Sequence, residues 1–171
     1  MDAQRDEVEK MADRMKDVLR DAYHYTDSGL DNIWLLHGFD RHQTPYGPAT
    51  SIRDIDALHQ SIAMSIVKSE KMTGQEFRFL RIELDLSQRA LAGLLKATEQ
   101  QVHRWENSKS KVPGPAQVAL SNYYVATQNP ESSLKELMDE LAQLDADITE
   151  LDLRLFELEG DDWVPTSPVA A

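Results

Sequence analysis

The chain has 171 residues, no cysteine, and 18 Lys and Arg against 30 Asp and Glu, which gives a formal net charge of −12. This length suits one domain, or one compact domain with appendages, and the lack of cysteine excludes disulfides, thiol chemistry and cysteine-based zinc fingers. The acidic start is not a secretory signal, and no segment approaches the roughly 18 apolar residues of a membrane span, so a cytoplasmic protein is expected.

The charge is unevenly distributed along the chain. Residues 1–72 carry a net charge of −4, residues 73–124 carry +2, and residues 125–171 carry −10. The negative total alone argues against nucleic acid, because duplex binding depends on Lys and Arg contacts to phosphate. This objection does not apply to the mildly basic residues 73–124. An uneven charge distribution of this kind often indicates that different parts of a chain bind different partners.

The first segment, residues 1–22, is expected to be an amphipathic helix over 4–22, because apolar residues recur there at steps of three and four among charges. In the next segment, residues 23–72, glycines and prolines surround the short apolar run Ile33–Leu36. This pattern predicts a small β element, with one strand near 32–37 and a second near 48–52.

A second helix is expected to close that segment. Ser51 and Asp54 form an S-x-x-D pattern, which is typical of a helix start. The buried stripe of this helix would consist of residues at helical spacing, namely Ile55, Leu58, Ile62 and Ile66.

Residues 73–124 predict four or five short helices. Thr73 and Glu76 have the spacing of a capping box at the start of the first helix. Ser87 and Thr98 are expected to cap the next two, and Pro113–Pro115 precedes a closing helix.

The segment 131–159 has the most regular spacing in the sequence. Eight apolar residues follow one another at alternating steps of three and four: Leu134, Leu137, Leu141, Leu144, Ile148, Leu151, Leu155 and Leu158. This a/d pattern predicts an acidic heptad helix that dimerises the protein, or that packs on the protein's own body. Gly160 would end it, and residues 160–171 are expected to form a flexible tail.

The centre of the chain contains the pattern that points to function. Residues 86–95 read LSQRALAGLL, and residues 98–107, after a short turn, read TEQQVHRWEN. Two short helices joined by a three- to four-residue turn describe a helix-turn-helix. The residues resemble the phage-repressor (Xre/Cro-like) family of transcription regulators, whose usual wording is L-S-Q-x-x-L-A-x-x-L, a turn, and S-x-x-x-I-x-x-W-E.

Side-chain chemistry supports the same interpretation of helix 98–107. Val102 and Trp105 are expected to anchor one face, which leaves the polar residues Glu99, Gln100, Gln101 and Arg104 outside for base readout. In the major groove Gln can pair with adenine, Arg with guanine, and Glu can accept from cytosine. The resemblance implies phosphate contacts by Ser87, Gln88, Thr98, His103, Lys109 and Lys111, which position the protein without specifying sequence.

Two positions depart from the family's wording. Lys96 and Ser108 stand where the family often has glycine. If either position requires a positive φ, a residue with a Cβ there costs roughly 1 kcal/mol.

A weaker resemblance covers residues 23–35, 51–54 and 73–81, which are similar to antitoxin-type regulators related to MqsA. That resemblance implies a dimer that represses its own operon. Proteins of this type carry a cysteine-based zinc module, which cannot be carried over to a chain without cysteine.

Together these patterns predict a mainly α protein: a five-helix repressor-like domain with an N-terminal helix, a small β element and a C-terminal heptad helix. The expected function is a sequence-specific, dimeric repressor that binds a pseudo-palindromic DNA operator. The alternatives are an antitoxin that neutralises a toxin or another basic protein, and an interaction adaptor without DNA binding. No catalytic or cofactor site is expected, because the sequence has no phosphate-binding glycine-rich loop, no G-x-S-x-G and no H-E-x-x-H. No metal site is expected either, because His37 and His42 have no second cluster at ligand spacing.

Overall fold

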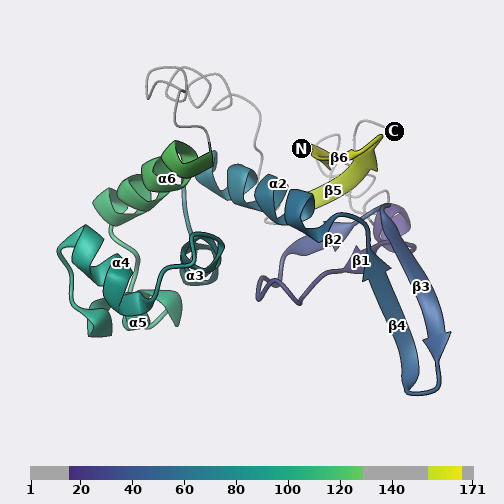
Figure 1. Ribbon diagram of the computed structural model, residues 1–171, viewed down its shortest axis with the longest axis horizontal. Helices are drawn as coiled ribbons and strands as arrows, with labels where there is room; N and C mark the ends of the chain where they lie inside the picture. The colour runs from purple at the N-terminus through teal and green to yellow at the C-terminus, as the bar shows by residue number, and fades with distance from the viewer. Residues whose placement is uncertain (1–15, 129–153, 167–171) are drawn as a thin grey trace, which may run out of the picture. The chain divides into compact units, whose positions relative to one another are not determined.

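The computed structural model describes residues 16–128 and 154–166, and these fall into two compact units. In the described part, unit 1 consists of residues 16–27, 31–61 and 154–166, and unit 2 of residues 28–30 and 62–128. Unit 1 contains the β structure, whereas unit 2 is helical (Figure 1). No helix in either described part is long and apolar enough to cross a membrane.

Unit 1 is built on a four-stranded sheet in the order β1-β2-β5-β6. Its strands are β1 (Tyr23–His24), β2 (Ile33–Leu35), β5 (Arg154–Glu159) and β6 (Asp162–Thr166). β2 and β5 are parallel, with Trp34 opposite Leu155, and the two outer pairs are antiparallel. The core contains Ile33, Leu35 and Phe156, all without solvent exposure.

The last strand is attached to the rest of unit 1 through Trp163. Its indole Nε1 donates to the carbonyl oxygen of Arg53 at 2.9 Å, and its own carbonyl oxygen accepts from Ser61 Oγ at 2.5 Å. Gly38 has a φ of +80°, and a Cβ at this position would lie 2.4 Å from the Trp163 ring. Only glycine combines that backbone conformation with this close packing.

A separate hairpin completes unit 1. β3 (Phe39–Thr44) pairs with β4 (Gly47–Ile52) in an antiparallel ladder, with Phe39 opposite Ile52. The two strands project as a long ribbon (Figure 1). Tyr46, in the turn between them, is fully exposed.

Helix α2 (Ile55–Val67) begins at a cap other than the one expected. Asp54 Oδ1 accepts from the backbone N–H of Ala57 at 3.0 Å, so Asp54 is the capping residue, whereas Ser51 lies inside β4. Leu58, Ile62 and Ile66 are buried as predicted, but Ile55 is 46% exposed.

Unit 2 contains α3 (Gly74–Glu83), α4 (Gln88–Leu95), α5 (Glu99–Glu106) and α6 (Gly114–Gln128). The predicted capping box at the start of α3 is present: Thr73 N–H donates to Glu76 Oε2 at 2.8 Å, and Thr73 Oγ1 accepts from Glu76 N–H at 3.2 Å. Phe77 and Leu80 are fully buried between the helices, where they form the centre of the unit's core.

The prediction of a mainly α, five-helix protein is wrong, because the described residues form a mixed α/β fold with a four-stranded sheet. The largest error concerns the heptad helix over 131–159. Residues 154–159 form strand β5, in which Leu155 is buried against the sheet, and residues 131–153 lie outside the described part. Leu155 and Leu158 therefore do not continue a coiled-coil seam.

The two ends of the chain also differ from expectation. Residues 162–166 of the predicted flexible tail form β6, and Gly160, with a φ of +65°, lies in the hairpin turn between β5 and β6 instead of ending a helix. Of the predicted helix 4–22, residues 16–19 are helical, residues 23–24 are already β1, and residues up to 15 lie outside the described part.

Candidate nucleic-acid interface

Helices α4 and α5 are joined by a tight turn whose ends are fixed by local hydrogen bonds. Ser87 Oγ accepts from Ala90 N–H at 3.0 Å and caps α4. α4 ends at Leu95, its C-cap Lys96 has a φ of +54°, and Ala97 N–H then donates to Ala92 O at 2.9 Å. Thr98 begins α5 directly afterwards, so the turn leaves the two helices little freedom.

The inner face of α5 is anchored by the two residues that the spacing identified. Val102 is fully buried and Trp105 is 8% exposed. The Trp105 ring meets Phe77 of α3 edge to face, with centroids 5.9 Å apart. Aromatic pairs in this arrangement contribute about 0.5–1.5 kcal/mol beyond their buried area, so α5 is held firmly on α3.

A buried polar cluster fixes the far end of α5, and sequence reasoning missed it. The Glu106 carboxylate accepts from Arg81 Nε at 2.5 Å and from Arg81 Nη2 at 3.0 Å. It also accepts from Gln88 Nε2 at 2.7 Å. Arg81 and Glu106 lie 25 residues apart, at positions whose helical spacing gives no sign of pairing.

The outer face of α5 is polar and exposed. The four residues expected outside for base readout are exposed, namely Glu99, Gln100, Gln101 and Arg104, and His103 is exposed beside them. Because the opposite face is buried, these side chains are presented on one short, rigid helix. Gln101 differs from its neighbours in that its side chain also belongs to the capping box with Thr98.

The residues expected to contact phosphate differ from one another in exposure and in hydrogen bonding. Ser87, Thr98, Lys109 and Lys111 are exposed at the ends of the two helices or in the loop that follows α5. Gln88 is half-buried, and one of its amide hydrogens is committed to Glu106. His103 is exposed beside Asn107, whose amide lies 3.5 Å from the imidazole ring.

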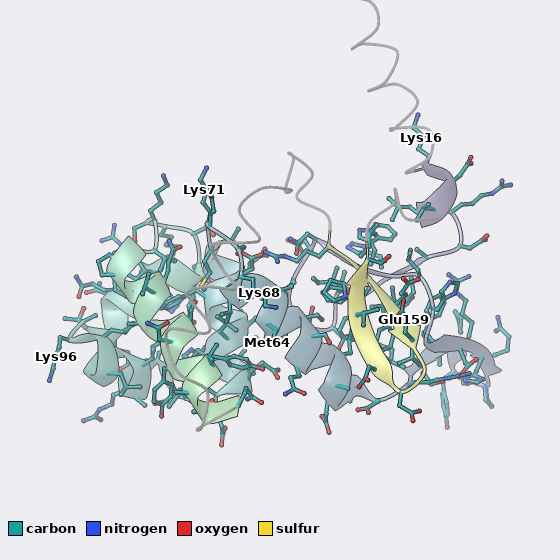
Figure 2. The ribbon with its side chains drawn as sticks, turned by 90° about the horizontal axis from the view of Figure 1, so that it is seen from above. Lys16, Met64, Lys68, Lys71, Lys96 and Glu159 are labelled. Atoms are coloured by element: carbon teal, nitrogen blue, oxygen red, sulfur yellow. The ribbon has the colours of Figure 1, made fainter. Side chains whose placement is uncertain are left out.

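Positive charge dominates the outside of unit 2 more than its net charge suggests. Arg78, Arg89, Lys96, Arg104, Lys109 and Lys111 are exposed, and Lys96 projects into solvent (Figure 2). Of the five acidic residues over 73–124, Glu76 and Glu106 are buried in the interactions described above. Only Glu83, Asp85 and Glu99 of this segment oppose the six exposed cations.

Three successive helices of unit 2 end in the same strained conformation. The residues Asp85, Lys96 and Ser108 follow α3, α4 and α5, and have φ values of +52°, +54° and +54°. In each case the next N–H bonds a carbonyl five residues earlier, which closes a Schellman motif. The positive φ suspected at Lys96 and Ser108 is therefore present at both.

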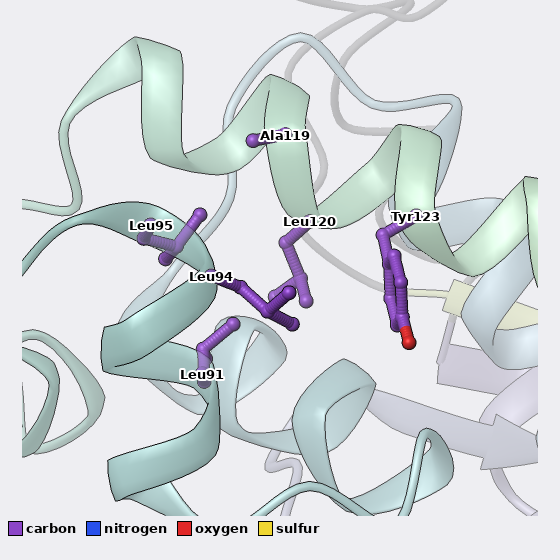
Figure 3. Close-up of a pocket in the computed structure, with 6 residues that line it drawn as sticks. All are labelled: Leu91, Leu94, Leu95, Ala119, Leu120 and Tyr123. Atoms are coloured by element: carbon purple, nitrogen blue, oxygen red, sulfur yellow. The ribbon is translucent and has the colours of Figure 1, made fainter.

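An apolar hollow lies on another part of unit 2, between α4 and α6 (Figure 3). Its volume is about 130 Å³, and it is lined by Leu91, Leu94, Leu95, Ala119, Leu120 and Tyr123. Leu94 is 51% exposed and Tyr123 is 40% exposed at its mouth. Tyr123 is the only one of these lining residues with a polar side-chain group, its hydroxyl.

Six of the predicted dimerisation residues lie outside the described part: Leu134, Leu137, Leu141, Leu144, Ile148 and Leu151.

Among the residues that are described, no group of three or more His, Asp or Glu side chains is arranged to hold a metal ion. His42 instead contacts Ser51 Oγ at 2.9 Å, and His59 contacts the Tyr25 hydroxyl at 2.8 Å.

Comparison with protein-family models, with curated proteins and with solved structures finds no match to this chain.

Proposed function

We propose that this chain is a sequence-specific DNA-binding transcription regulator that inserts α5 into the major groove. The observation that carries the proposal is the construction of α5. One face is anchored by Val102, Trp105 and Glu106, and the other presents Glu99, Gln100 and Arg104 to solvent. These are side chains whose hydrogen-bonding groups match base edges.

The adjoining helix supports this use of α5. Ser87 and Gln88 start α4, and Lys109 and Lys111 follow α5, so hydroxyl, amide and ammonium donors stand at both ends of the motif. Such donors bind phosphate oxygens and fix the register of a recognition helix. A pure protein-interaction surface has no need of this combination of flanking donors and a polar helix face.

The charge distribution limits how tightly DNA is held. The six exposed cations of residues 73–124 limit the number of phosphate contacts, and each such contact contributes to binding through the release of counterions. We therefore expect weak, salt-limited affinity for random DNA, and recognition that depends mainly on base contacts. Two copies on a pseudo-palindromic operator, with half-sites one helical turn apart, would double these contacts.

Selection from a pool of random duplexes at a fixed salt concentration tests the proposal. The wild-type protein is expected to enrich a short motif with two-fold symmetry. The matched control is the double variant Gln100→Ala with Arg104→Ala, which retains the buried anchors and is expected to enrich nothing. If the wild-type protein enriches no sequence and binds duplex equally well at low and high salt, DNA recognition is excluded and an adaptor role is favoured.

A further inference from the structure

Gln101 makes three hydrogen bonds with Thr98, and the two that its side chain accepts determine which of its atoms are available to DNA. Its Oε1 accepts from the backbone N–H of Thr98 at 2.8 Å and from Thr98 Oγ1 at 3.1 Å. Thr98 Oγ1 in turn accepts from Gln101 N–H at 3.2 Å. A carboxamide oxygen has two lone-pair sites, so its accepting capacity is filled within the capping box.

The orientation of this carboxamide is fixed by chemistry. A backbone N–H can only donate, so the group that faces the Thr98 N–H must be the oxygen of the Gln101 side chain. The NH₂ group then points away from the cap, on a residue that is exposed. Gln101 can therefore offer two donors to a ligand and no acceptor.

This restriction changes the base that Gln101 can read. The two-bond pairing of glutamine with adenine requires a donor and an acceptor on the same carboxamide. A donor-only group instead matches best the bases that present acceptors without a competing donor in the major groove, which are guanine through N7 and O6, and thymine through O4. Adenine offers its N7 acceptor only beside the N6 donor, which a donor-only group leaves without a partner. Cytosine, with its N4 donor, is rejected.

We propose that Gln101 is a specificity-determining residue that acts only as a donor and selects guanine, with thymine second, at one position of the operator. This inference rests on the proposed function. The adjacent Gln100 is exposed, and no side chain or backbone group of the described residues hydrogen-bonds its carboxamide. Gln100 retains both donor and acceptor, so the two neighbouring glutamines read different bases.

The substitution Gln101→Glu tests the inference, because it removes the two donors and retains acceptor oxygens for the capping box. Glutamate is the usual residue at this position of the box, so α5 keeps its first turn. The variant Gln100→Glu is the matched control, since it adds the same negative charge one residue away. Far-ultraviolet circular dichroism and thermal unfolding establish that both variants are folded.

Duplex selection is carried out with wild-type protein and both variants at one salt concentration. Gln101→Glu is expected to convert one guanine or thymine position to cytosine, or to abolish its preference, with a loss of roughly 5- to 150-fold on the wild-type duplex. Gln100→Glu is expected to change a different position, at which the wild-type protein prefers adenine.

Two results overturn the inference. One is a Gln101→Glu motif identical to that of the wild type, and the other is the loss of an adenine position in this variant. Both results can be told apart from failure of the proposed function. In that case the wild-type protein itself enriches no motif, and the donor-only assignment of Gln101 fails together with the proposed function.

Discussion

Arg81 of α3 and Glu106 of α5 form a two-bond ion pair underneath the proposed recognition surface. Arg81 also donates through Nη1 to the carbonyl oxygen of Leu86 at 2.7 Å, in the turn before α4. Gln88, in the first turn of α4, donates to the same carboxylate. One buried cluster therefore joins α3, α4 and α5, and sets the position of α5 relative to the helix that precedes it.

Removal of one partner of this pair should destabilise unit 2 strongly. Arg81→Met leaves the Glu106 carboxylate buried with only Gln88 as a donor, and breaking a buried pair in this way costs about 3–5 kcal/mol. Urea unfolding measures the change. The double variant Arg81→Met with Glu106→Leu should be more stable than the single variant. A loss below about 1 kcal/mol for Arg81→Met would show that the cluster contributes little.

The left-handed conformation at Ser108 predicts a stabilising substitution. Ser108→Gly relieves the contact between Cβ and backbone at a φ of +54°, and the flexibility of glycine in the unfolded chain offsets part of that gain. We expect a net increase in the free energy of unfolding of roughly 0.5–1 kcal/mol. Ser108→Ala, which keeps the Cβ, should give no increase. Equal stability of the two variants in thermal unfolding would contradict the claim that the Cβ at residue 108 strains the backbone.

Tyr124 of α6 should make stability depend on pH in the alkaline range. Burial, with a further contribution from the charge of Glu83, raises the pKa of Tyr124 from 10.0 to about 12. Above pH 10 the unfolded chain ionises this phenol while the folded chain keeps it protonated, so the free energy of unfolding falls as the pH rises. Tyr124→Phe should reduce this fall between pH 10 and 12. The measurement is urea unfolding at several pH values, and equal slopes for wild type and Tyr124→Phe would exclude the mechanism.

Lys109 follows α5 and should contact phosphate rather than bases. Lys109→Ala is expected to weaken binding to every duplex by a similar factor, and to reduce the slope of log K against log salt by about 0.9. Lys71→Ala, which removes a cation before α3, serves as the control and should leave the slope unchanged. Fluorescence anisotropy titrations at several salt concentrations measure both slopes. A change in base preference in Lys109→Ala would contradict the assignment.

The helical part of the fold was predictable because its signals are local. Thr73 with Glu76, and Thr98 with Gln101, lie three residues apart, and each pair forms the hydrogen bonds that its spacing indicates. The buried anchors Val102 and Trp105 likewise follow from helical spacing within one short segment. The left-handed turn at Lys96 was detectable for the same reason, since it concerns a single backbone position.

The sheet of unit 1 was not predictable, because its central pairing joins distant segments. Trp34 of β2 lies opposite Leu155 of β5, and no local pattern identifies a partner about 120 residues away. Leu155 and Leu158 meet the three- and four-residue steps of a heptad by coincidence, while Phe156, which is fully buried, falls off that seam. The turn sequence Gly160–Asp161, between a segment with alternating apolar residues and the pair Trp163–Val164, was the available sign of a hairpin.

The same distinction applies to the candidate site. The exposed residues of α5 follow from periodicity, whereas the commitment of Gln88 to Glu106 and of Gln101 to Thr98 requires three-dimensional contacts. Both side chains were expected to be free for DNA. Their hydrogen bonds leave Glu99, Gln100 and Arg104 as the side chains of α5 available for unrestricted base readout.

The central claim is that the exposed face of α5 reads DNA sequence, and Gln100 tests it most directly. The measurement is an anisotropy titration of wild-type protein and Gln100→Ala with the selected duplex and with a shuffled duplex of the same composition. The account predicts that Gln100→Ala loses about 1–3 kcal/mol of binding free energy on the selected duplex and nothing on the shuffled one. Equal affinity of the wild-type protein for both duplexes, or an unchanged affinity of Gln100→Ala for the selected duplex, would contradict it.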